Sequence, residues 1–181
     1  VCGALRDVKR AFDPRGVLNP GNIVETGPAE RIIANLRVAP HGEDAHPPIV
    51  DTFFSYAREE GFDHAIEGCN GAGLCRRTTG GTSMCPSYRA LRDERHATRG
   101  RGNALRLAVT GQLAKDRWAD PATMETLDLC LSCKACKTEC PSNVDISKLK
   151  AEYAAQRHAE HGTPLATRVF GHVRRLNALG S

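Results

Sequence analysis

The sequence has few aromatic side chains and no long apolar run. Phe, Trp and Tyr make up 5% of the 181 residues, with a single Trp, so the chain lacks the aromatic platforms on which single-stranded nucleic acids stack. No stretch approaches the roughly 20 consecutive apolar residues that a membrane-spanning helix needs. We therefore expect neither a nucleic-acid partner nor a membrane span.

An excess of one charge is also lacking. Lys and Arg number 25 against 21 Asp and Glu, and the resulting net charge of +4 is small for a nucleic-acid-binding surface. Hydrophobic residues make up 40% of the chain, which is enough for a packed core. The chain begins at Val1 and its methionines are Met84 and Met124, so we expect a piece of a larger protein.

The sequence is, in contrast, rich in cysteine. Seven of its 8 cysteines lie between Cys69 and Cys140, in two groups that each end in Cys-Pro. A disulfide framework needs no such grouping, whereas a metal centre does. Cys2 lies far from both groups, and we interpret it as a small buried apolar residue.

The second group matches the pattern C-x2-C-x2-C-x3-C-P at every position. It consists of Cys130, Cys133, Cys136 and Cys140, followed by Pro141. Three thiolates at this spacing hold three corners of an iron–sulfur cube, while the fourth cysteine ligates a different cluster. Zinc sites usually pair two C-x2–4-C units and do not need a third evenly spaced thiolate, so zinc and disulfides are the lesser alternatives.

The first group has the same form with one ligand missing. When it is laid over the second group, Ala72 falls where a cysteine should be. The crossed arrangement typical of two-cluster ferredoxins then gives two ligand sets. One is a complete set for a [4Fe–4S] cluster, Cys85, Cys130, Cys133 and Cys136, and the other holds three thiolates, Cys69, Cys75 and Cys140.

The three-thiolate set leaves two alternatives open. A cube corner without a protein ligand is the one most easily lost, which favours a [3Fe–4S] cluster. In the other alternative, a [4Fe–4S] cluster takes water, a carboxylate or an amide at its fourth iron, and Asn70 is close in sequence.

The apolar pattern predicts a mainly α-helical chain. We expect helices over residues 3–12, 63–68, 87–91, 99–112 and 121–130, another from Asp145 onward, and a last amphipathic helix after Pro164. Asp120 is the expected N-cap of the helix over 121–130. Residues 26–49 resemble a linker, and residues 52–56 have the composition of a strand.

Eight arginines lie between Cys75 and Gln112. Taken singly, each is best explained as part of a solvated face paired with Asp93 and Glu94; as a group, they are suited to donate hydrogen bonds or positive potential to anionic clusters. They are Arg76, Arg77, Arg89, Arg92, Arg95, Arg99, Arg101 and Arg106.

Two stretches resemble known families. Leu5 to Asn22, with Leu18-Asn19-Pro20-Gly21, resembles the C-terminal end of an FAD-linked oxidase domain. Glu67 to Arg106, with Met84-Cys-Pro-Ser-Tyr-Arg89 and Thr98-Arg-Gly-Arg101, resembles the iron–sulfur part of bacterial fused FAD-binding and (Fe–S)-binding dehydrogenases. That family is similar to D-2-hydroxyglutarate dehydrogenase and, more distantly, to D-lactate dehydrogenases and the iron–sulfur subunits of glycolate oxidase.

The resemblance implies an α-helical two-cluster ferredoxin module preceded by a short remnant of an FAD-linked oxidase domain. The expected divisions are the oxidase end over 1–25, a linker with short strands over 26–60, the two-cluster domain over 61–162, and a helix over 163–181 that leads to a further module. The flavin of the parent protein would oxidise a D-2-hydroxy acid, and this segment would pass the electrons on singly without catalytic residues of its own.

The implied partners are the FAD-linked oxidase domain of the same protein and either a downstream cysteine-rich module or an acceptor, a quinone or a flavoprotein. The implied location is cytoplasmic, with any membrane association made through an acceptor complex. Two other functions remain open from the residues: an iron–sulfur adaptor subunit of a respiratory dehydrogenase, and a zinc-binding interaction module without enzymatic activity.

Overall fold

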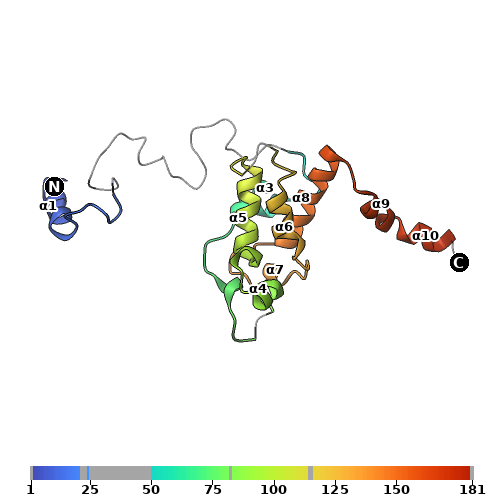
Figure 1. The fold of residues 1–181 in the computed structure, drawn as a ribbon, viewed down its shortest axis with the longest axis horizontal. Coiled ribbons are helices and arrows are strands. Elements are labelled where there is room, and N and C mark those ends of the chain that lie inside the picture. The colour runs from blue at the N-terminus through green and yellow to red at the C-terminus, as the bar shows by residue number, and fades with distance from the viewer. Residues whose placement is uncertain (1, 21–23, 25–49, 82, 114–115, 180–181) are drawn as a thin grey trace. The chain divides into compact units, whose positions relative to one another are not determined.

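A computed structural model describes residues 2–20, 24, 50–81, 83–113 and 116–179 (Figure 1). The chain separates into two compact units, residues 1–46 and 47–181, which are described separately. The expected linker over 26–49 lies outside the described residues.

The first unit contains the helix α1 (Cys2–Phe12), which agrees with the predicted helix over 3–12. Asp13 follows it and is buried, and its carboxylate accepts hydrogen bonds from the backbone amides of Val17 and Leu18. Lys9 pairs with the same carboxylate at 2.6 Å. The hydrogen bond from Lys9 lowers the pKa of Asp13 to about 2, so a charged side chain holds the turn that ends this helix.

The second unit is built from helices, and no strand occurs among the described residues, which confirms the mainly α prediction. Its α-helices are α3 (Phe62–Glu67), α4 (Pro86–Leu91), α5 (Thr98–Val109), α6 (Pro121–Asp128), α7 (Ala135–Glu139), α8 (Ile146–His161), α9 (Leu165–Gly171) and α10 (Val173–Leu179). Three 3-10 turns accompany them: η2 (Ala57–Glu59), η3 (Leu74–Arg76) and η4 (Glu94–His96).

The core of the second unit forms around α5, which packs against α3, α6 and α8. Leu105, Ala108 and Val109 of α5 are completely buried. Beside them, Trp118 lies between Phe62 and Tyr153, at ring-centroid distances of 6.2 and 5.4 Å. The short helices α4 and α7 lie at one end of this bundle (Figure 1). The bundle therefore leaves one end to the segments that carry the cysteines.

Two acidic caps fix the starts of α6 and α8; the sequence predicted the cap at Asp120 and a helix start at Asp145. The Asp120 carboxylate accepts a hydrogen bond from the Thr123 amide at 2.7 Å, and Pro121 occupies the first helical turn. Asp145 accepts from the amide of Lys148 at 3.0 Å. Each cap satisfies an amide that the helix itself leaves without a partner.

The strand expected over residues 52–56 is wrong. The segment is irregular, and the backbone amides of Phe53 and Phe54 donate to the carboxylate of Glu152 on α8, at 3.1 and 3.0 Å. Glu152 is completely buried. A side chain of α8 therefore takes the place that a neighbouring strand would have had.

The last helix is also not continuous as expected, because it divides into α9 and α10 at His172. Gly171 ends α9, where glycine lowers helix stability, and no residue of α9 is buried. Because α9 buries no side chain against the core, no packing energy offsets the loss of helix stability at this glycine.

The cap of α6 gives the first testable prediction. Because Asp120 accepts hydrogen bonds from both the amide and the hydroxyl of the fully buried Thr123, Asp120→Ala removes two buried bonds. We expect the free energy of unfolding, measured by denaturant titration, to fall by about 1 to 2 kcal/mol. Asp128→Ala at the exposed opposite end of α6 is the matched control and should leave it unchanged. Equal losses in the two variants would contradict the prediction.

Candidate metal centres

Four cysteines from both sequence groups line one pocket at the end of the bundle. The pocket is small, with a cavity of about 20 Å³, and is lined by Cys85, Cys130, Cys133 and Cys136. Cys85 and Cys136 are buried, Cys130 is half-buried and Cys133 is exposed. We call this the four-thiol pocket. It joins the same four residues that the crossed spacing grouped together.

Cys85 enters the four-thiol pocket in the left-handed backbone region, with φ 53°, directly before Pro86 begins α4. Its sulfur lies 2.8 Å from the hydroxyl of Thr98, the first residue of α5. Burial raises the pKa of the Cys85 thiol to about 11, while the hydrogen bond with Thr98 and the charge of Arg101 act in the opposite direction. The start of α5 therefore favours the thiolate that burial disfavours.

Cys136 receives similar support from the start of α8. Burial raises the pKa of its thiol, while hydrogen bonds from the backbone amides of Ile146 and Ser147 lower it. Amides at a helix N-terminus carry partial positive charge and stabilise a nearby anion. The two most buried sulfurs of the pocket thus each face a helix start.

The loop between Cys130 and α7 is held by side chains of α8. Ser147 donates to the carbonyl of Ser132, and Lys150 donates to the carbonyl of Cys130 at 3.0 Å. Ser132 and Lys134 both adopt the left-handed backbone region, with φ 52° and 61°. This geometry is costly for residues with a side chain, so the loop is shaped by its surroundings rather than by its own preference.

The other three cysteines line a second pocket, also with a cavity of about 20 Å³. Cys69, Cys75 and Cys140 contribute to it, and Cys75 is the buried member. We call this the three-thiol pocket. Ala72, the residue at the position of the missing cysteine, also lines it. Asn70 lines it too, but its side-chain oxygen accepts a hydrogen bond from the Ala72 amide at 3.1 Å.

Glu139 ties the two cysteine groups together. One of its carboxylate oxygens accepts from the amide and hydroxyl of Ser83, at 3.0 and 2.6 Å, and the other from the amide of Met84 at 2.9 Å. The hydrogen bonds from Ser83 hold the pKa of Glu139 below its usual range. The residue before Cys140 therefore fixes the backbone that leads into Cys85.

The cysteine sulfurs of the described residues are not gathered around a single point. Among the described residues, no three cysteines have sulfur atoms that all lie within 4.8 Å of one another. A tetrahedral zinc ion with Zn–S bonds of about 2.3 Å would need sulfurs about 3.8 Å apart. The cysteines from Cys69 to Cys140 are also free thiols, with no disulfide among them.

Arg101 places a buried positive charge beside the four-thiol pocket, which it also lines. Its side chain is 2% exposed and donates to the carbonyls of His96 and Thr126 and to the hydroxyl of Ser87. None of these acceptors is charged. A buried cation without a carboxylate partner is costly, and an anionic thiolate-bound group in the pocket would balance it. The residues of the pocket therefore fit such a group.

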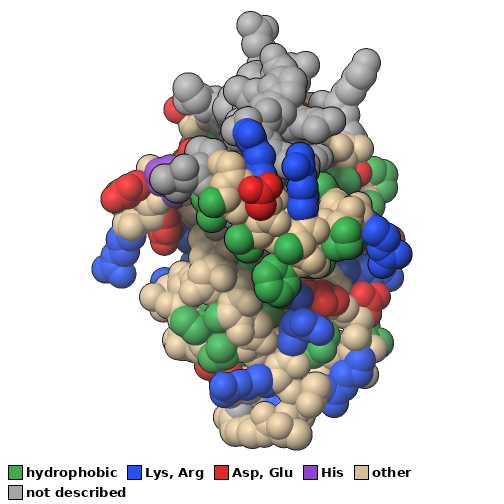
Figure 2. Space-filling model, turned by 90° about the vertical axis from the view of Figure 1, so that its left-hand side faces the viewer, with side chains coloured by type: hydrophobic (Ala, Val, Ile, Leu, Met, Phe, Trp, Pro, Cys, Tyr) green, Lys and Arg blue, Asp and Glu red, His purple; other side chains and the backbone are tan. Residues whose placement is uncertain are grey.

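The other arginines that the sequence singled out divide between the two interpretations. Arg95 and Arg99 pair with Asp93 and Glu94, as expected for a solvated face. Figure 2 shows that on the face it draws, Lys and Arg side chains stand among acidic and apolar side chains rather than in one patch. The sequence did not identify Thr98 or Glu139 as functional, because neither belongs to a cysteine pattern.

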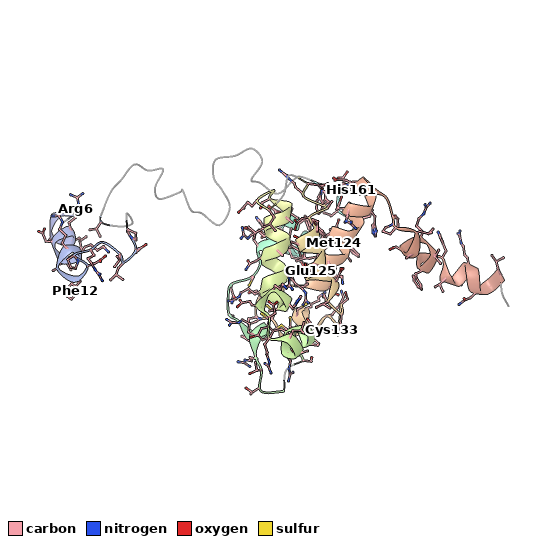
Figure 3. All side chains as sticks on the ribbon, in the orientation of Figure 1. Arg6, Phe12, Met124, Glu125, Cys133 and His161 are labelled. Carbon is pink, nitrogen blue, oxygen red and sulfur yellow. The ribbon has the colours of Figure 1, made fainter. Side chains whose placement is uncertain are left out.

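One further group has the composition of a metal site. Asp116, Glu160 and His161 are exposed, and their ligand atoms lie within 4.8 Å of one another. His161 lies at the opposite end of the bundle from Cys133 (Figure 3). Nothing connects this group with the cysteine pockets. The side chain of Cys2 lies outside the described residues, so its expected burial remains a prediction.

Comparison with known proteins finds relatives of the cysteine-bearing segment. Residues 65–144 match the model of the 4Fe-4S dicluster domain family. The chain is 26% identical to D-2-hydroxyglutarate dehydrogenase of Pantoea ananatis over 93% of its length, and 27% identical to that of Escherichia coli over 89%. It is 34% identical to the glycolate oxidase iron-sulfur subunit of Escherichia coli over 45% of its length.

The chain spans about a fifth of the length of these relatives: 19% and 18% of the two dehydrogenases and 17% of the iron-sulfur subunit. No solved structure shows a significant match. Among the helices that the structure describes, none combines the length and the apolar character that crossing a membrane requires.

The bridge made by Glu139 leads to a second prediction. In the wild type, the Glu139 carboxylate accepts from the backbone amides of Ser83 and Met84. Glu139→Gln replaces one of its two acceptor oxygens with an NH2 donor, so we expect these two amides to exchange hydrogen about tenfold faster. Chelators should also remove metal from the variant faster. Glu125→Gln, which alters only an exposed pair with Arg95, is the control.

The same bridge depends on pH in a defined direction. The pKa of Glu139 is lower in the folded protein than the ordinary value of 4.5. The stability that the charged carboxylate adds to the fold is therefore fully present above pH 4.5 and is lost as the pH falls through the lower pKa of the folded state. The unfolding temperatures of Glu139→Gln and the wild type should therefore converge in acid. A difference that persists at the lowest pH would argue against a charged bridge.

Proposed function

We propose that this chain binds two iron–sulfur clusters and relays electrons singly between a flavin domain of the same protein and an acceptor. The observation that carries the proposal is the division of seven free thiols between two pockets, four in one and three in the other. The match to the 4Fe-4S dicluster family supports it.

In the proposed ligand sets, the four-thiol pocket holds a [4Fe–4S] cluster through Cys85, Cys130, Cys133 and Cys136. The three-thiol pocket holds a [3Fe–4S] cluster, or a [4Fe–4S] cluster with a non-protein ligand, through Cys69, Cys75 and Cys140. Such clusters, when bound, accept and release one electron at a time. The side-chain oxygen of Asn70 already accepts a backbone hydrogen bond, and this favours the three-iron form.

The chain's own residues provide the environment for this role. Thr98, Arg101 and the amides at the start of α8 direct positive charge or hydrogen bonds at the buried sulfurs. The exposed Cys133 and Leu131, which is 71% exposed, leave the four-thiol pocket close to the surface. An electron can therefore enter or leave this site without crossing a thick layer of protein.

The substrate class follows from the relatives. In the proposed reaction, a D-2-hydroxy acid gives two electrons and two protons to the flavin and becomes a 2-oxo acid. An acceptor, a quinone or another flavoprotein, then receives the two electrons one at a time. D-2-hydroxyglutarate is preferred over glycolate because the dehydrogenases match about nine tenths of this chain, whereas the glycolate oxidase subunit matches 45%. A cytoplasmic location, with membrane contact only through the acceptor, belongs to the same proposal.

The metal content tests the proposal directly. The protein, purified without oxygen, should be brown, absorb near about 400 nm and contain about seven irons per chain, with the EPR signal of an oxidised three-iron cluster. About eight irons without that signal would support a second four-iron cluster instead. A colourless protein that contains zinc in proportion to the chain would overturn the relay in favour of a structural zinc module.

The missing ligand gives a sharper test. Ala72 lines the three-thiol pocket, so Ala72→Cys supplies a fourth thiolate there. We expect the iron content to rise from about seven to about eight and the three-iron EPR signal to disappear. Ala72→Ser has a similar size with a much weaker ligand and is the matched control. An unchanged EPR signal in Ala72→Cys would argue against this position as the missing corner.

A further inference from the structure

Thr98 uses its hydroxyl differently from two other threonines in the helices of the second unit. The hydroxyls of Thr110 and Thr126 donate to carbonyls four residues earlier, as is usual for threonine at or near a helix. The Thr98 hydroxyl lies 2.8 Å from the sulfur of Cys85, and both residues are buried. A ligating thiolate can only accept, so in the loaded protein Thr98 must be the donor.

Thr98 also lies between the two cysteine pockets. Among the residues that the structure describes, it alone lines both the four-thiol and the three-thiol pocket, so it forms part of the wall between them. Its hydroxyl is nevertheless directed at a cysteine of the four-thiol set. The hydrogen bond therefore acts on one site and not equally on both.

A hydrogen bond to a ligand sulfur affects the reduction potential of the cluster that the sulfur holds. Reduction adds negative charge, and a donor stabilises the more negative state more strongly, so the bond raises the potential. The backbone amide of Thr98 also bonds to Cys85, and Arg101 adds a positive charge nearby. Only the hydroxyl can be removed without altering the backbone or the net charge.

We propose that the Thr98 hydroxyl, through its hydrogen bond to Cys85, raises the reduction potential of the four-thiol site and thereby sets its difference from the potential of the three-thiol site. This inference deepens the proposed function and rests on it. Thr98 is a positioning residue in this role, because it acts through Cys85 and not on a substrate.

The test is an anaerobic redox titration of the loaded protein in which EPR follows each cluster separately. In Thr98→Val, the ratio of reduced to oxidised cluster at the four-thiol site, read at a fixed potential, should fall about tenfold, which corresponds to a shift of about 59 mV for one electron. The three-thiol site should keep its potential. Thr98→Ser, which restores a hydroxyl, should recover most of the shift.

Thr110→Val is the matched control, because Thr110 follows the same helix, is 1% exposed and donates to the Arg106 carbonyl rather than to sulfur. It should lower stability without shifting either potential. Thr98→Val with unchanged potentials, or with equal shifts at both sites, would overturn the proposal. A wild-type protein without iron–sulfur absorption would instead refute the proposed relay itself.

A measurement on the wild type covers the case in which Thr98→Val does not retain its clusters. A hydroxyl exchanges its proton in D2O far faster than a buried backbone amide does. Brief transfer into D2O should therefore shift the iron–sulfur stretching bands of the four-thiol site in the resonance Raman spectrum. Bands that remain unshifted after brief transfer would show that no hydroxyl donates to the cluster ligands and would refute the proposal.

Discussion

Burying thiolates is the constraint on which the second unit depends. A sulfur that ligates metal is negatively charged, yet the two most buried cysteines of the four-thiol pocket, Cys85 and Cys136, lie where burial raises the thiol pKa. The protein opposes that cost with two helix starts: Thr98 of α5 faces Cys85, and the first amides of α8 face Cys136. The starts of these two helices are therefore placed where they favour the charge of the sulfurs, in addition to the apolar packing of the helices.

The backbone around the sulfurs is also held from outside. Cys85, Ser132 and Lys134 adopt left-handed geometry that residues with side chains rarely take, and α7 has only 5 residues, too few to be stable alone. Contacts from α8 fix part of this loop, and ligand–metal bonds contribute folding energy in sites of this kind. The packed face of α5, with Leu105, Ala108 and Val109 completely buried, supports these segments from the core.

Sequence patterns were informative where the physics is local. The spacing of cysteines predicted the grouping of thiols that the two pockets display, and Asp120 was placed at a helix start by its short-range capping chemistry. The strand expected over 52–56 was wrong because its amides bond to Glu152, about a hundred residues along the chain. Glu139 escaped notice for the same reason: its partners Ser83 and Met84 lie in the other cysteine group. Composition does not encode such long-range pairs.

A single-electron relay needs two sites that are close together and chemically unequal, and the crossed cysteines provide the first condition. Each sequence group sends its last cysteine, the one before proline, to the pocket of the other group, so the two sites cannot separate without disrupting both segments. Glu139 reinforces the crossing from the outside, and Thr98 stands in the wall between the pockets. The second condition, that the two sites differ chemically, is met by residues on either side of that wall. In the proposed relay, Ala72 would leave one site a ligand short and the Thr98 hydroxyl would donate to a ligand of the other, so neighbouring sites built from one repeated motif would differ in their affinity for the electron.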